Sequence, residues 1–315
     1  VSFPSVDKTI PNPEVYESDS FWPSKDYDYL GTQMQRGYNI AILNVYPYKY
    51  NPISKELFTY TDISITIEGS RNDQLKSQQA NMLRSDAKAI GELKQIIVNP
   101  ENISSYSQSS LWRTHNPQSR LIDLSQPKSM IVITTSHATE WWAEYVAWRN
   151  AKGVSTAVYT TNEIYAAYSG EDNAAKVRAF IQDAYQSWSN TATPLEYVIL
   201  GGDDELVPER GAYGRVGNTV DTRMPTDMYF GNLDGNWNAN QNQIYGESND
   251  QVDMLPEVHI GRFPAETAAE FANMFRKTMA YVENDTYSNN ISIMFGENLN
   301  NNPLTWGGDY KDEVM

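Results

Sequence analysis

Alternation of apolar and polar residues is the first pattern along the chain. Residues 39–48 and 56–67 alternate in this way, and the isoleucines of the second stretch would point to one side of a strand. Proline, asparagine and serine residues between the two stretches favour a turn, so the sequence predicts that they pair as antiparallel strands. Residues 1–98 are therefore expected to be β-rich.

The alternation is lost between residues 99 and 128. This segment is rich in Ser, Asn, Gln and Pro and follows no sustained period, which is typical of an exposed connector. Beyond it, short runs of β-branched residues alternate with helical patterns, such as the apolar stripe from Val177 to Trp188. Such alternation predicts an α/β fold with a parallel sheet flanked by helices. The expected strands are residues 130–135, 154–159, 195–200, 257–262 and 291–295.

The start of one helix and the ends of the strands can be predicted from the sequence, and the strand ends indicate where ligands would bind. Thr267 and Glu270 have the spacing of a capping box and predict the start of a helix after the fourth strand. Right-handed crossovers would bring the carboxyl ends of the strands to one edge, where open α/β sheets bind ligands. Candidate functional residues are therefore expected directly after the strands.

Two acidic residues, Asp203 and Asp204, follow the strand expected at 195–200. They could bind a cation, orient a catalytic group or cap the next segment, and capping or a structural metal is the favoured interpretation. His137, also at a strand end, could join them in a metal site or act as a general base. A single histidine at a helix start is more often structural. A metal-dependent hydrolase that uses His137, Asp203 and Asp204 is therefore kept only as an alternative hypothesis.

Oxygen-bearing side chains alternate along residues 232–247. The spacing is similar to that of a calcium loop, because alternate residues can direct their oxygens at one hard cation. Asparagine replaces most of the acidic ligands of an EF-hand, so an exposed polar loop is the competing interpretation. The candidate calcium ligands are Asp234, Asn236, Asn238, Asn240, Asn242 and Glu247, with Asp203 and Asp204 as further candidate metal ligands.

Composition narrows the classes of function. The 315 residues carry 24 Lys and Arg against 40 Asp and Glu, a net charge of −16, which disfavours a nucleic-acid partner because phosphate binding needs a basic surface. The chain contains no cysteine, so it supplies neither a disulfide framework nor a thiol nucleophile. No apolar run approaches the roughly 20 residues of a membrane span. The many Tyr, Asn, Ser and Thr residues favour an extracellular surface.

The motifs of several common enzyme classes are absent. The sequence contains no G-x-S-x-G, no H-E-x-x-H and no P-loop. Thr134, Thr135 and Ser136 stand where a dinucleotide-binding protein has its glycine-rich turn. Serine hydrolases, zincins, P-loop nucleotide hydrolases and Rossmann dehydrogenases are therefore disfavoured.

Six strings occur in a distinctive order along the chain. They are YKYNPISKELFTYTDISITIE (48–68), YVILGGDDELVPE (197–209), TDMYFGNLDG (226–235), PEVHIGRFPAE (256–266), KTMAYVEN (277–284) and PLTWGGDYKDE (303–313). Together they resemble the gingipain family of cysteine peptidases. The resemblance implies a precursor in four parts: a β-rich propeptide (1–98), a connector with a processing site (99–128), the first subdomain of a caspase-like peptidase domain (129–289) and the truncated start of the second, catalytic subdomain (290–315).

The resemblance also implies where the catalytic chemistry lies. Members of this family use a Cys/His pair, and both residues lie downstream of the region matched here, so this chain is expected to hold neither and to be inactive alone. Asp309 matches an acidic position of the substrate pocket, where it would pair with Arg or Lys of a substrate, although capping of the next helix is its alternative role. The parent protein is expected to be secreted or at the cell surface.

The implied partners are protein or peptide substrates, the propeptide packed on the catalytic domain, and the missing C-terminal part of the same protein. Release of the propeptide would require a cut in the connector, for which Arg113 and Arg120 are the candidate sites. The second hypothesis is a non-catalytic caspase-like scaffold that binds a partner or supports surface-protein export. The presence or absence of the Cys/His pair downstream would decide between the two.

Overall fold

The computed structural model describes residues 12–68, 80–106, 121–189, 191–250, 252–284, 298–301 and 304–306. The chain divides into two compact units. One comprises Val1–Asp28, Asn44–Thr66 and Thr278–Met315, and the other comprises Tyr29–Leu43 and Ile67–Lys277. The second unit contains the parallel sheet and all the contacts that form the candidate site below.

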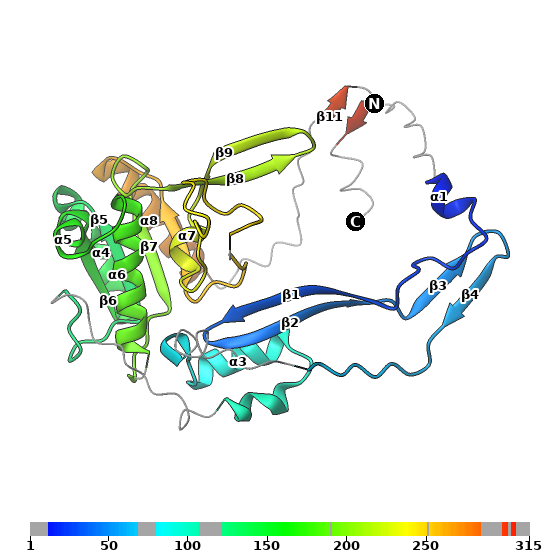
Figure 1. The fold of residues 1–315 in the computed structure, drawn as a ribbon. Helices are drawn as coiled ribbons and strands as arrows, with labels where there is room; N and C mark the ends of the chain where they lie inside the picture. The colour runs from blue at the N-terminus through cyan, green and yellow to red at the C-terminus, as the bar shows by residue number, and fades with distance from the viewer. Residues whose placement is uncertain are drawn as a thin grey trace. The chain divides into compact units, whose positions relative to one another are not determined.

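Two antiparallel hairpins occupy the N-terminal part of the chain (Figure 1). β1 (Tyr27–Gln35) pairs with β2 (Tyr38–Val45), and β3 (Tyr48–Asn51) pairs with β4 (Glu56–Thr59). The turn between β1 and β2 is Arg36-Gly37, in which both residues have positive φ, 49° and 83°. Positive φ at both central residues is the geometry of the tight turn that matches the twist of a hairpin.

The expected pairing of residues 39–48 with residues 56–67 is confirmed only at its turn end, where Tyr48 pairs with Thr59, and is wrong elsewhere. Most of the first stretch lies in β2, which pairs with β1, and only residues 56–59 of the second stretch lie in a strand. Local turns decide the pairing: the Asn51 side chain accepts the N–H groups of Ile53 and Ser54 and closes the β3–β4 turn. The isoleucines expected to share a strand face are all exposed, namely Ile63, Ile65 and Ile67.

A parallel sheet in the order β10–β7–β5–β6 forms the centre of the larger unit. The strands are β5 (Met130–Thr134), β6 (Thr156–Thr160), β7 (Tyr197–Gly201) and β10 (His259–Phe263). They confirm the predicted fold class and four of the expected strands, whereas the strand expected at 291–295 lies outside the described residues. The chain adds β6 on one side of β5 and β7 on the other, so the sheet has its switch point between β5 and β7.

Helices cover both faces of this sheet (Figure 1). On one face, α6 (Asn173–Trp188) packs its apolar stripe, as predicted, against Ile131 and Ile133 of β5 and Val198 and Leu200 of β7. A Cβ added to Gly201 would meet Trp142 at 2.4 Å. Because Gly201 and Leu200 point to opposite faces of a strand, Trp142 covers the other face.

An aromatic cluster fills that second face. Trp142 ends η3 (Ser136–Trp142), and its ring centroid lies 5.6 Å from that of Tyr145 in α4 (Ala143–Ala151) and 4.9 Å from that of Phe275 in α8 (Ala268–Glu283). The capping box predicted before α8 is confirmed, because Thr267 and Glu270 exchange side-chain-to-backbone hydrogen bonds of 3.1 and 3.4 Å.

A hairpin that the sequence did not predict follows β7. It consists of β8 (Arg210–Val216) and β9 (Thr219–Thr226). The remaining elements are α1 (Pro13–Tyr16), α3 (Ala87–Ile96), η1 (Pro100–Ser105), α5 (Thr161–Ala167), α7 (Met228–Gly231), β11 (Asn298–Asn301) and β12 (Leu304–Trp306). Among the helices in the described ranges, none has the length and apolar character needed to cross a bilayer.

Candidate functional site

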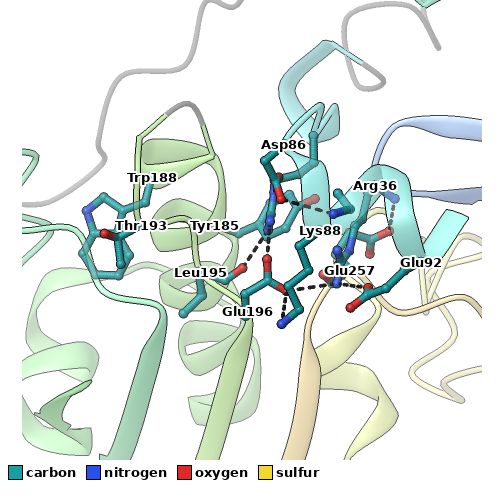
Figure 2. A network of polar contacts seen from close by, with 12 residues as sticks. Arg36, Asp86, Lys88, Glu92, Tyr185, Trp188, Thr193, Leu195, Glu196 and Glu257 are labelled. Carbon is teal, nitrogen blue, oxygen red and sulfur yellow. Dashed lines mark hydrogen bonds and ion pairs between the residues drawn. The ribbon is translucent and has the colours of Figure 1, made fainter. Parts of the chain in front are cut away.

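A buried group of charged side chains lies at the amino ends of β7 and β10 (Figure 2). Glu196 directly precedes β7, and Glu257 precedes β10. Their exposed fractions are only 5% and 0%. A buried carboxylate is costly unless it is paired, so the groups that face these two residues determine what this edge of the sheet can do.

Arg84, which lies upstream of the connector, enters this site with none of its surface exposed. Its Nη1 donates to the Leu195 carbonyl at 2.9 Å, its Nη2 donates to the Glu196 carboxylate, and its Nε donates to Asp86 at 2.6 Å. The guanidinium lies 5.9 Å from the centroid of the Tyr185 ring. Burial alone would lower the pKa of Arg84, but the bonds to Asp86 and Glu196 and the nearby Tyr185 keep that pKa above its ordinary value. The side chain is therefore a permanent cation.

Arg36 reaches the same site from the tip of the β1–β2 hairpin. Its Nη2 donates to Glu196 at 3.2 Å and lies 2.9 Å from Glu92 of α3, while its Nε donates to the backbone carbonyl of Glu257 at 3.2 Å. The backbone N–H of Arg36 donates to the Glu257 carboxyl at 3.3 Å. A non-glycine residue in the left-handed region costs on the order of 1 kcal/mol. The contacts of Arg36 therefore hold a strained turn in place.

Lys88 completes the cationic side of the site. Its Nζ lies 3.3 Å from Glu196, donates to the Tyr197 hydroxyl at 2.8 Å and lies 4.4 Å from the centroid of the Tyr197 ring. In the described part of the chain, the cations paired with Glu196 are Arg36, Arg84 and Lys88, and all of them precede the connector. The N-terminal segment thus neutralises a carboxylate of the parallel sheet.

Apolar and backbone contacts extend this interface on both sides. Met82 is 3% exposed and belongs to the same core cluster as Tyr185 of α6, whose hydroxyl donates to the Met82 carbonyl at 2.9 Å. On the other side, the N–H of Met34 donates to Asp253 at 2.8 Å. The segment around Met82 is therefore packed into the core of the larger unit, and the segment around Met34 is hydrogen-bonded to the rest of that unit.

Glu257 and two neighbouring aspartates have raised pKa values. Burial and the neighbouring Asp234 raise the pKa of Glu257 well above its ordinary value, although the N–H groups of Leu233 and Arg36 oppose this shift. Burial and Asp253 raise the pKa of Asp234 to about 7, and burial raises that of Asp253. These carboxyl groups hold a proton more readily than ordinary ones, whereas Glu196 is the carboxylate on which Arg36, Arg84 and Lys88 converge.

The carboxyl edge of the sheet carries the residues that the sequence marked for metal binding or catalysis. The Asp203 side chain accepts the N–H groups of Glu205 and Leu206 at 3.2 and 3.3 Å, as a turn-capping residue does. His137 Nδ1 lies 3.0 Å from the Thr135 hydroxyl, and its ring packs edge-on against Trp141.

A different trio has the spacing of metal ligands. Among the described residues, the group of His and acidic side chains close enough to share an ion is Glu92, Glu196 and His259, and it includes neither His137, Asp203 nor Asp204. Glu196 in this group is already paired with two arginines. Their positive charge opposes a cation at this position, so we interpret the trio as part of the ion-pair site.

The asparagine oxygens of the expected calcium loop are engaged in hydrogen bonds within the loop. The side-chain oxygens of its asparagines each accept a backbone N–H within the loop, and the amide groups of Asn240 and Asn242 donate to Glu247 at 3.0 and 2.6 Å. Asp234 is buried and instead accepts from the Asn232 amide at 3.3 Å. This donor set fits a hydrogen-bonded polar loop better than a single calcium cage. The asparagines concerned are Asn236, Asn238, Asn240 and Asn242.

The other predicted site residues cannot be placed. Asp309, the candidate pocket residue, and Arg113 and Arg120, the candidate processing sites, lie outside the described residues. Their roles therefore stay predictions.

Comparison with protein-family models identifies two consecutive matches along the chain. The model described as Propeptide_C25 matches residues 2–97, and the model described as Peptidase family C25 matches residues 123–313. The chain belongs to peptidase family C25. In the frame of this family, the buried site joins Arg36 and Arg84 of the propeptide span to Glu196 and Glu257 of the peptidase span.

Gingipains of Porphyromonas gingivalis are similar to this chain. Gingipain R2 is 22% identical over 275 residues, which cover 87% of this chain and 31% of that protein. Gingipain R1 is 23% identical over 274 residues, which cover 86% of this chain and 22% of that protein. The C25 chain thus spans less than a third of the length of these relatives.

Solved structures with local similarity come from the same group. The crystal structure of the Arg specific cysteine proteinase gingipain R is 22% identical, with a TM-score of 0.32 and coverage of 53% of this chain and 30% of that one. The complex of the RgpB pro- and mature domains is 24% identical, with a TM-score of 0.31 and coverage of 48% and 28%.

Sequence reasoning did not find the residues of the buried site. Arg84 and Glu196 are separated by 112 residues, and Arg36 and Glu196 by 160. Each one looks like an ordinary surface charge in its own segment. The available signal was the position of Glu196 and Glu257 within the strands expected at 195–200 and 257–262, because a charge that a strand carries into the core needs a partner.

Proposed function

We propose that this chain is the propeptide and the first catalytic subdomain of a secreted cysteine endopeptidase precursor. The observation that carries this proposal is the order of the family matches, a propeptide span at 2–97 followed by a peptidase span at 123–313. The packing of Arg84 and Met82 into the larger unit supports it, because a propeptide must bind the domain that it precedes.

The chemistry proposed for the parent protein is attack of a thiolate on a peptide carbonyl. The Cys/His pair that performs it would lie downstream of this chain, which has no cysteine of its own. Asp309 would bind an arginine or lysine of the substrate next to the scissile bond. A location outside the cell or at its surface belongs to the same proposal. So does a structural calcium ion, which would bind at residues 232–247 only if the side chains there left their present hydrogen bonds.

The test is to assay the full-length parent protein on peptides that differ only in the residue before the scissile bond. We expect cleavage after Arg or Lys, little cleavage after Leu, and loss of activity after alkylation with iodoacetamide. The isolated 315-residue chain should show no activity in the same assay.

Activity that survives alkylation would contradict the thiol mechanism. If the full-length protein hydrolyses no peptide at all and its downstream sequence lacks the Cys/His pair, the peptidase hypothesis is rejected in favour of the non-catalytic scaffold. Activation of the isolated chain by zinc or manganese would support the metal-dependent alternative with His137, Asp203 and Asp204.

A further inference from the structure

The charges of the buried site are divided unequally between the propeptide and peptidase spans. Arg84 is paired with Asp86 and Arg36 with Glu92, so each arginine keeps an acidic partner from its own segment if the two spans separate. Glu196 has no such reserve, since the cations that pair with it among the described residues all come from the propeptide span. If the two spans separate, Glu196 therefore loses the cations that neutralise it, whereas each arginine keeps one acidic partner.

The surface around Glu196 has the shape and chemistry of a guanidinium site (Figure 2). The Leu195 carbonyl and the Glu196 carboxylate accept from the two terminal nitrogens of Arg84, and the Tyr185 ring lies close to the guanidinium. A planar cation with several fixed donors satisfies two adjacent acceptors at once, whereas an ammonium group does so poorly. The same surface also seats Met82, which is nearly fully buried.

We propose that the amino ends of β7 and β10 form an arginine-binding docking site that holds the propeptide without help from the covalent connector. Its occupant is the segment that carries Arg84, and Glu196 with the Leu195 carbonyl recognises the guanidinium. The inference rests on the proposed precursor function but does not depend on which peptide bonds the enzyme cleaves. Cutting the connector alone then leaves the propeptide bound.

The first test uses the full-length protein with its catalytic thiol alkylated and a site-specific protease sequence placed within residues 107–120. After the cut, size-exclusion chromatography should show the N-terminal fragment eluting with the rest of the protein. Arg84→Met should release it, with a dissociation constant raised by at least about 100-fold, because one side of a buried ion pair is removed. An Arg84→Met fragment that still co-elutes at the same dilution would overturn the proposal.

Arg210→Met is the matched control. Arg210 is also buried and ion-paired, but its partner Asp172 lies on the same side of the connector. This substitution should lower the thermal stability and leave the fragment bound. Release by Arg210→Met to the same extent as by Arg84→Met would show that retention reports general stability, and the docking site would be rejected.

A second measurement avoids the question of whether the Arg84 variant folds. A labelled peptide of residues 80–98 is titrated into the cut and alkylated protein after its N-terminal fragment has been removed. The substitution Arg84→Gln in the peptide, or Glu196→Gln in the protein, should weaken binding by at least about 100-fold. Arg84→Lys in the peptide should weaken it less, about 10-fold.

Two outcomes of the titration would count against the site. One is equal binding of the unchanged peptide and the peptide with Arg84→Gln, and the other is no binding of the unchanged peptide at millimolar concentration. Both are independent of the peptidase assay, which is performed before alkylation. An active peptidase that releases its propeptide on cutting would refute the docking site alone, and an inactive protein that retains it would refute the peptidase function alone.

Discussion

At the scale of single residues, Asp172 shows how one side chain can join distant parts of the peptidase span. It caps α6 by accepting the Ala175 N–H at 2.8 Å, and both of its oxygens accept from Arg210 of β8 at 2.7 Å. The Arg210 guanidinium in turn lies 4.5 and 3.9 Å from the ring centroids of Tyr229 and Tyr245. The unpredicted β8–β9 hairpin is thereby attached to the start of a helix that the sequence did predict.

We expect the stability that Asp172 contributes to be lost in acid. Burial raises its pKa, but the hydrogen bonds from Arg210 and Ala175 outweigh burial and hold the pKa below its ordinary value of 3.8. The contribution is therefore present above about pH 4 and is lost as the pH falls through the lower pKa of the folded state. Its size is modest, about 1 kcal/mol, because the side chain is 44% exposed.

Two substitutions of Asp172 distinguish the stability contributed by its ion pair with Arg210 from the stability contributed by its cap of α6. Asp172→Asn keeps a good capping residue and should lose about 1 kcal/mol at pH 7, whereas Asp172→Ala should lose about 1 kcal/mol more. Urea unfolding of the full-length protein at pH 7 and pH 3 measures both. If the two variants are equally stable at pH 7, the cap contributes nothing, and if the loss for Asp172→Asn is the same at both pH values, the ion pair is not its cause.

At the scale of elements, the parallel sheet was predictable, whereas the β1–β2 and β8–β9 hairpins were not. The two central strands, β5 and β7, are short apolar runs of the kind that a parallel sheet buries, and β5 is completely buried in the structure. The pairing of β1 with β2 depends instead on the positive φ of Arg36, and arginine is not a residue type that predicts a turn. The β8–β9 hairpin is exposed along most of β9, so no hydrophobic pattern marks it.

The loop at residues 232–247 gives the calcium proposal a direct test. If the loop is a hydrogen-bonded polar loop, as its internal bonds favour, millimolar calcium should leave the thermal midpoint of the full-length protein unchanged relative to EDTA. If its oxygens rearrange around calcium, the midpoint should rise with calcium and much less with magnesium, which demands stricter geometry. Glu247→Gln should then abolish the rise.

The control for this test is Asp204→Asn, which lies outside the loop. It removes one carboxylate of the other candidate metal-binding pair and leaves the loop intact. A calcium response lost in Asp204→Asn and kept in Glu247→Gln would place the ion at the carboxyl edge of the sheet. A response kept in both variants would exclude both of the predicted sites.

At the scale of the whole molecule, the propeptide and peptidase spans meet through residues that no local pattern connects. The change of composition at residues 99–128 predicts a boundary between two parts, and the two family matches end at residue 97 and begin at residue 123. The contact between these parts has no such signal, because Arg36 and Arg84 are far from Glu196 in the sequence and meet it only in the folded chain. Long-range ion pairs of this kind are visible only in three dimensions.

The packing of the residues that follow Arg120 bears on where the connector is cut. Cleavage after Arg120 requires Leu121 and Ile122 to enter the cleft of a peptidase, but Ile122 is only 5% exposed and belongs to the core cluster. The next residue, Asp123, accepts through its carbonyl from Trp188 Nε1 at 3.1 Å. Arg120 therefore directly precedes a packed segment, whereas Arg113 lies several residues further from it along the chain.

We accordingly expect the matured protein to begin at Thr114, following a cut after Arg113. N-terminal sequencing of the processed full-length protein measures this directly, and Arg113→Gln should slow processing while Arg120→Gln leaves its rate unchanged. A start at Leu121 in the unmodified protein would mean that Ile122 leaves the core before the cut. In that case Ile122→Ala, which weakens the packing, should accelerate processing, and a start outside residues 114–121 would exclude both arginines as the processing site.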